Sequence, residues 1–144
     1  MMKRFIASLW RDQTAASAIE FALIGPAFIT MFMGVMQVGM GMQNYNALRS
    51  ISADTARYAV VSYQNSNQVT AIQIQNFAKA AAIRAPYGLQ NADFVAFVST
   101  PSNQRVSGAI EFKLKLTYQV PTFLKIIGID NIPVTYTRPI FVLP

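Results

Sequence analysis

FALIGPAFITMFMGVMQVGMGM, residues 21–42, is the stretch that decides the fold. It contains no charged residue, and Thr30 and Gln37 are its only polar side chains. A helix of this length crosses the ~30 Å apolar core of a bilayer at about 1.5 Å per residue. In a chain of 144 residues, too little sequence remains to enclose so long a helix that is apolar on all sides. The stretch therefore predicts one transmembrane helix, residues 21–42.

Basic residues before this stretch predict its orientation. Lys3, Arg4 and Arg11 precede the span, and Asp12 is the only acid among them. Because basic flanks stay on the cytoplasmic side, we expect the N-terminus in the cytoplasm. A removable secretory signal has an apolar core of only about 7–15 residues. We therefore expect this longer span to remain in the mature protein.

Composition argues against catalysis. The chain has no cysteine and no histidine, and its six acids are far apart in sequence. This removes thiolate metal sites and Ser-His or Cys-His nucleophiles, and no phosphate loop or hydrolase motif is present. The net charge is +6, but the basic residues from Arg49 to Arg138 are scattered, which disfavours nucleic acid. We expect a non-enzymatic protein with no cofactor or metal, no nucleic-acid partner, and membrane lipid around its span.

Glu20 is the one acid at the edge of the span. A carboxylate costs roughly 2.5–3.5 kcal/mol at mid-bilayer and less near the surface, so Glu20 needs a partner. One hypothesis is a capping box, in which Ser17 and Glu20 begin the helix by bonding each other's backbone amides. The other is that Glu20 enters a bundle of neighbouring helices and meets a cation there. Both remain open at this point.

Small residues and one proline modify the span. Gly25 and Gly34 are among several small residues that allow close approach of another helix. Pro26 removes the hydrogen bond that the Ala22 carbonyl would normally accept, which predicts a kink or a loosened turn.

Residues 14–28, TAASAIEFALIGPAF, resemble the TadE-like pseudopilin family of the tight-adherence (Tad or Flp) pilus systems. In that family a basic leader ends in a small residue, usually glycine, and glutamate follows five residues later, before Phe or Tyr and a long apolar helix. The resemblance puts prepilin peptidase processing between Ala15 and Ala16, with Glu20 and Phe21 fifth and sixth in the mature form. Ala15 stands where glycine is usual, so a processed and a retained leader both stay open.

The resemblance also implies a function. Weaker likenesses are ALR at 47–49, ARYA at 56–59 and YQVP at 118–121. A TadE-like chain would be a minor pilin that assembles with other pilin or pseudopilin subunits and the pilus assembly platform and serves surface adhesion. The α-amino group exposed by processing would be the best cation for Glu20. The implied location is the bacterial inner membrane, with the C-terminal domain in the periplasm and entry into a surface pilus open. The alternative is a single-span structural subunit of an envelope secretion or transport complex with an uncleaved N-terminus.

Two helices are predicted from apolar spacing. The first runs over residues 16–61, because Leu48, Ile51, Thr55 and Tyr58 continue one face until the polar stretch 62–68. The second covers residues 69–83 and ends before Pro86. The apolar face predicted for it consists of Val69, Ile72, Ala80 and Ile83.

Alternation predicts strands in the remainder. Residues 93–99 alternate weakly, whereas residues 108–120 alternate cleanly, with Glu111 on the polar side. Residues 132–142 read as a last strand, which Pro133 and Pro139 place at a sheet edge. The predicted fold class is α+β and pilin-like: a long N-terminal transmembrane and stalk helix, a second helix and a small antiparallel sheet. The predicted organisation is a basic cytoplasmic leader 1–15, a long helix 16–61 and an extracytoplasmic α+β domain 62–144.

Overall fold

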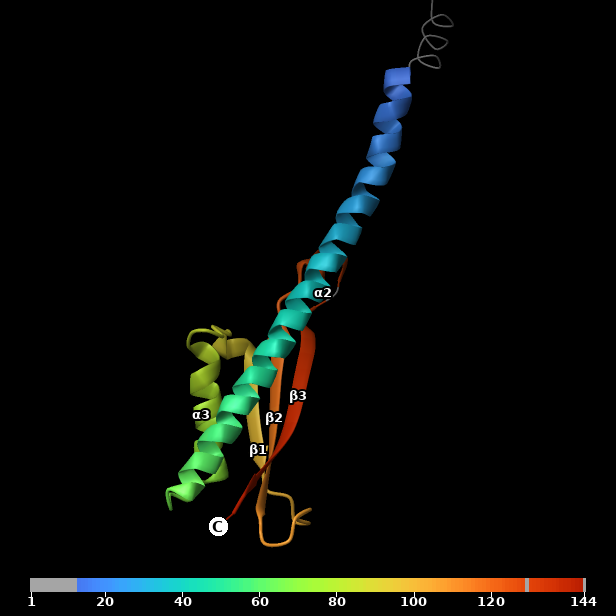
Figure 1. Cartoon of the computed structure of the whole chain (residues 1–144). Coiled ribbons are helices and arrows are strands. Elements are labelled where there is room, and N and C mark those ends of the chain that lie inside the picture. Colours follow the sequence, from blue (N-terminus) through green and yellow to red (C-terminus); the bar gives the residue numbers. More distant parts are fainter. Residues whose placement is uncertain (1–12, 129, 144) are drawn as a thin grey trace, which may run out of the picture. The chain divides into compact units, whose positions relative to one another are not determined.

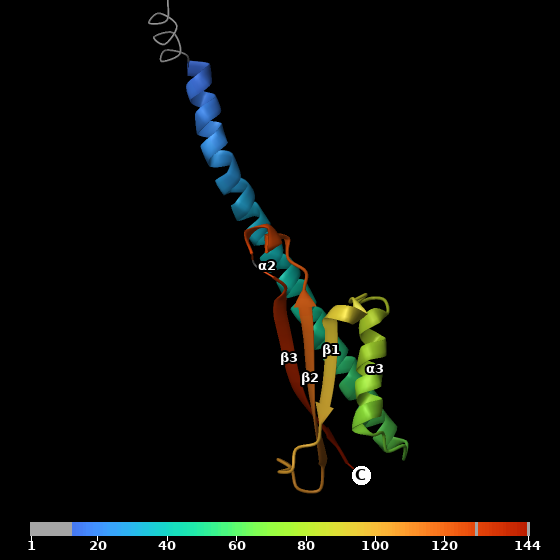
Figure 2. The same cartoon turned by 180° about the vertical axis from the view of Figure 1, so that it is seen from behind.

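The computed structural model describes residues 13–128 and 130–143. The chain divides into two compact units, Met1–Val38 and Gly39–Pro144. The described part of the first unit is entirely helical. In the second unit the rest of the long helix and a second helix pack against a sheet (Figures 1 and 2). The predicted α+β fold is confirmed.

The long helix, α2, spans Gln13–Gln64 and has 52 residues. It continues into the polar stretch that was predicted to break it, and the reason is its C-terminal cap. Ser66 has a φ of 57°, and the Asn67 amide donates to the Ser62 carbonyl at 2.9 Å while the Ser66 amide donates to Tyr63 at 3.0 Å. This pair of bonds is a Schellman cap, which satisfies the last carbonyls three residues later than predicted.

The capping box proposed for Ser17 and Glu20 is wrong. An N-cap residue has non-helical backbone angles. Gln13 already belongs to α2, so Ser17 lies inside the helix rather than at its start. Glu20 therefore does not begin this helix.

The second helix, α3, spans Ala71–Ile83, and its capping box is at Thr70. The Thr70 hydroxyl accepts from the Gln73 amide at 3.3 Å, and Gln73 Oε1 accepts from the Thr70 amide at 2.7 Å. The helix ends before Pro86, as predicted.

The face predicted for α3 is wrong. The side chains that α3 buries are Ile74, Ala78 and Ala82, whereas Ile72 is 69% exposed and Ile83 49%. Alanines at 78, 80, 81 and 82 make several faces nearly equal in hydrophobicity. The sequence pattern therefore does not determine which face of α3 is buried. Packing of the helix against the sheet determines it.

The sheet is antiparallel, with strand order β1-β2-β3. Its strands are β1 Phe94–Ser99, β2 Ile110–Val120 and β3 Ile132–Val142, with short 3-10 helices η1 (Asn91–Asp93) and η2 (Phe123–Ile127) beside them. Leu114 sits opposite Val98 on one side and Arg138 on the other. The edge position of β3 is confirmed.

One hydrophobic core joins these elements in the second unit. Leu48 and Ile51 from α2, Ile74 from α3, and Leu114 and Leu116 from β2 have no exposed surface. Leu114 and Leu116 lie on the side of β2 opposite to that of Glu111, as the alternation predicted. Burial of each such side chain stabilises the unit by about 1.5–3 kcal/mol relative to exposure.

Candidate assembly surface

The part of α2 before Gly39 exposes its large apolar side chains. These are Ile19, Phe21, Leu23, Ile24, Phe28, Ile29, Met31, Phe32, Val35, Met36 and Val38. At about 100° per residue they cover most of the helix circumference. A soluble monomer rarely exposes so large a contiguous apolar surface. The helix is long and apolar enough to cross a membrane, which fits the predicted single-pass arrangement.

The helix continues through Pro26. The Thr30 hydroxyl donates to the Pro26 carbonyl at 2.7 Å. This bond satisfies the hydroxyl within its own helix, and such back-bonding is what makes a threonine compatible with an apolar environment.

Small residues leave bare backbone on this helix. A Cβ placed on Gly34 would meet no other atom within 4 Å, and one on Gly25 would meet only the Phe21 ring, at 3.9 Å. The Phe21 ring therefore lies over Gly25, one turn further along. The open space beside Gly34 permits another helix to approach closely.

Glu20 and Phe21 lie on the exposed surface, at the N-terminal end of the apolar segment. Phe21 is 78% exposed, and Glu20 is also exposed. Within residues 13–128 and 130–143 the structure shows no ion pair to Glu20. The carboxylate is therefore available to a donor on another molecule.

The other predicted site residues fall near or beyond the described range. Ala15 and Ala16 are helical residues of α2 whose side chains are not described. Lys3, Arg4 and Arg11 lie outside the described residues. The processing point, the leader and the orientation of the span remain predictions.

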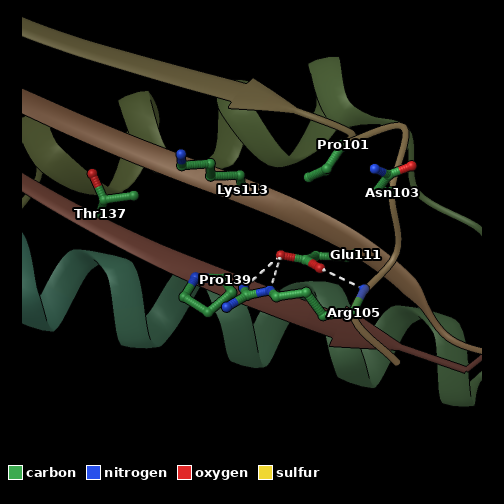
Figure 3. A pocket seen from close by; sticks show the side chains of 7 residues that line it. All are labelled: Pro101, Asn103, Arg105, Glu111, Lys113, Thr137 and Pro139. Atoms are coloured by element: carbon green, nitrogen blue, oxygen red, sulfur yellow. Dashed lines mark hydrogen bonds and ion pairs between the residues drawn. The ribbon is translucent and has the colours of Figure 1, made fainter. Parts of the chain in front are cut away.

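The α+β unit contains a buried carboxylate that sequence reasoning missed. Glu111 was expected on the polar side of β2, but it is only 3% exposed. Arg105 Nε donates to Glu111 Oε1 at 2.9 Å, and the Arg105 backbone amide donates to Oε2 at 3.3 Å (Figure 3). The Glu111 amide in turn donates to Gln104 Oε1. No motif signals this arrangement, because the loop that carries Arg105 must fold back to create it.

The electrostatics of this pair are mutual. Hydrogen bonding to the Arg105 guanidinium holds the pKa of Glu111 below its ordinary value of 4.5, and the same bond raises the pKa of Arg105. A hollow of about 340 Å³ adjoins the pair, and Lys113, Thr137 and Pro139 complete part of its wall. Because both oxygens of the carboxylate are engaged, the pair ties the loop to β2. Across the described chain, no three metal-ligating side chains gather in one place.

These observations define a class of protein: an α+β protein whose N-terminal helix exposes an apolar, membrane-length segment with a carboxylate at its beginning. The family model described as TadE-like protein matches residues 15–57. The predicted resemblance is thereby confirmed over a range that includes Glu20 and Phe21. The match ends at Arg57, so the likeness proposed for residues 118–121 lies outside it. Searches of curated proteins and of solved structures find no match.

Proposed function

We propose that this chain is a non-enzymatic minor pilin, or pseudopilin, that takes part in assembly of a Tad-type pilus used in surface adhesion. The observation that carries the proposal is the exposed apolar segment of α2 with Glu20 and Phe21 at its start, inside the range matched by the TadE-like family model. A surface of this kind suits packing against lipid and other apolar helices. Its partners would be other pilin subunits and the assembly platform.

Topology follows from the charges of the leader. Lys3, Arg4 and Arg11 would hold the N-terminus in the cytoplasm, the apolar segment would cross the inner membrane, and the α+β unit would lie in the periplasm. Side contacts made by that unit would then add to the contacts of the helix.

Glu20 would supply specificity within the membrane. An ion pair with a cation of a neighbouring subunit offsets the cost of moving a carboxylate into lipid, which reaches roughly 2.5–3.5 kcal/mol at mid-bilayer. In a processed subunit, an α-amino group freed between Ala15 and Ala16 is a suitable partner. Helices that fail to provide the cation would leave the carboxylate unpaired and would be rejected.

The proposal is tested by replacing Glu20 with Gln in cells that contain the complete pilus system. We expect loss of co-purification with other pilin subunits and of surface pili, while the protein stays in the membrane. Asp93→Asn is the matched control, because it removes one carboxylate from the α+β unit. Unchanged association and piliation in the Glu20 variant would overturn the assembly role of this carboxylate.

The alternative is a single-span structural subunit of an envelope secretion or transport complex. It is favoured by Ala15, which stands where the family usually has glycine before the processing point. Intact mass of the chain expressed with its prepilin peptidase distinguishes the two. Loss of residues 1–15 supports the processed pilin, whereas the full mass supports the retained leader.

A further inference from the structure

We propose that a groove between α2 and α3 binds an acidic segment with apolar side chains from a neighbouring protein. Two adjoining hollows form this α2–α3 groove, which lies within the α+β unit. The first, of about 370 Å³, is lined by Asp54, Arg57, Tyr58, Val61, Phe77 and Ala81. The second, of about 240 Å³, shares Asp54, Phe77 and Ala81 and extends along the end of α3 to Arg84 and Tyr87.

Aromatic rings make the apolar floor of the groove. Tyr58 of α2 stacks on Phe77 of α3 with parallel rings 4.2 Å apart. Val61 continues this surface and is 44% exposed. The stack holds the two helices in place, so the floor exists before any partner arrives. Preformed aromatic pockets of this kind accept anchoring side chains at protein interfaces.

The acid of the groove is already engaged. The Tyr87 hydroxyl donates to Asp54 Oδ2 at 2.8 Å. Partial burial, and then this hydrogen bond, raise the pKa of Tyr87, so its hydroxyl stays protonated and keeps the bond. Asp54 is thereby directed toward the loop after α3.

The cations of the groove are available. Arg57 and Arg84 are exposed, and neither makes an ion pair within residues 13–128 and 130–143. They stand in the two adjoining hollows, with the aromatic floor shared between them. A guanidinium binds a carboxylate with two parallel hydrogen bonds, and a bidentate pair also fixes orientation.

Charge and shape together specify the occupant. A segment that places an apolar side chain on Phe77 and carboxylates beside Arg57 and Arg84 would match the aromatic floor and both cations, while Asp54 keeps its bond to Tyr87. A basic segment would face two like charges and would be excluded. A lipid would satisfy the cations through its phosphate, but the groove residues lie outside the apolar stretch 21–42 that is predicted to contact lipid. The occupant is therefore an acidic protein segment with apolar anchors.

Photo-crosslinking in cells tests this inference. A photoreactive phenylalanine analogue replaces Val61 in the full chain, expressed with its native neighbours. The control analogue replaces Ile72, which lies on α3 away from both hollows and is 69% exposed. We expect a protein adduct from position 61 only, and peptide mapping should place it on a segment rich in Asp or Glu and apolar residues.

Charge reversal supplies the second measurement. Arg57→Glu with Arg84→Glu should lower the adduct yield by about tenfold, since opposing like charges weaken the contact. Lys79→Glu reverses one charge on α3 outside the groove and should leave the yield unchanged. Reversing the acids of the mapped segment to Lys should restore the adduct with the double variant. Arg57→Gln with Arg84→Gln, a milder pair, repeats the test if the Glu pair does not fold.

Several outcomes would overturn the inference. In the crosslinking experiment these are an adduct with lipid alone, equal yields from positions 61 and 72, or a mapped segment that is basic or belongs to a second copy of this chain. In the charge-reversal experiment it is failure of the charge-swapped partner to restore the yield. The groove lies outside the membrane-length segment, and the readout is contact at position 61. Its success or failure is therefore separate from that of Glu20 in pilus assembly.

Discussion

The two parts of α2 bury their side chains very differently. Before Gly39 the helix exposes apolar residues on most sides, as Leu23 (74%) and Val35 (67%) illustrate. After Gly39 the same helix has one buried stripe, with Leu48 and Ile51 at 0%, and it exposes Arg57. The later part obtains its burial from α3 and the sheet. The earlier part has to obtain it from lipid or from another protein.

The two carboxylates of these regions differ in the same way. Glu111 finds its cation, Arg105, within the α+β unit and is largely removed from solvent. Glu20 has no ion pair in the described part of the chain and stays exposed. A charge that is paired within the chain affects the stability of the fold. An unpaired charge at an apolar surface instead affects which partner the surface binds.

The largest expected effect separates the two regions by stability. Leu114→Ala should lower the free energy of unfolding of the α+β unit by about 2–5 kcal/mol, because it leaves a cavity in a fully buried site. Leu23→Ala, at an exposed site, should change it by less than about 0.5 kcal/mol. Denaturant unfolding of the full chain in detergent measures both. Equal losses would mean that the apolar part of α2 also contributes to the folded core.

A second prediction concerns membrane integration. Val35→Arg places a charge in the middle of the apolar segment and should cost roughly 2.5–3.5 kcal/mol of insertion free energy. The fraction that resists extraction at alkaline pH should therefore fall. Ile72→Arg introduces the same charge at an equally exposed apolar position on α3. It should leave that fraction unchanged, and a parallel fall in both variants would argue against the span.

Periodicity predicted the elements whose environment is simple. The apolar stretch 21–42 is long enough to predict one continuous helix, and residues 132–142, read as a last strand, form β3, Ile132–Val142. Two prolines also placed β3 at the edge, since proline cannot donate to a ladder. Because these signals are local, the elements can be predicted without knowledge of the rest of the fold.

The features that could not be predicted depend on contacts that no local sequence pattern encodes. The face of α3 is chosen by the sheet, because its alanines leave the pattern ambiguous. Burial of Glu111 requires Arg105 to fold back over β2, and the α2–α3 groove requires Tyr58 to meet Phe77. The capping box at Ser17 failed for a different reason: its residues fit the motif, but the helix had already begun by Gln13. Glu20 and Phe21, by contrast, were predicted from a short motif that lies inside the family match, and their role in assembly stays a prediction.

The smallest expected effect sharpens the contrast between the two carboxylates. Because the Arg105 hydrogen bond lowers the pKa of Glu111 in the folded state, the unfolded state takes up the proton first as pH falls. The stability supplied by this pair is fully present above its ordinary pKa of 4.5 and is lost as pH falls through the folded-state pKa. Glu111→Gln should therefore be less stable than the wild type at pH 7, and the difference should shrink toward pH 3.

Denaturant midpoints at the two pH values measure this difference. Asp93→Asn is the matched control, since Asp93 precedes β1 at the end of the sheet where Phe94 pairs with Tyr118, away from the start of β2. The control should keep the pH dependence that comes from Glu111. A constant difference between the wild type and Glu111→Gln from pH 7 to pH 3 would show that the Arg105 contact adds nothing in the charged form. Glu111 and Glu20 would then differ in the burial of their side chains but not in the stability that an ion pair supplies.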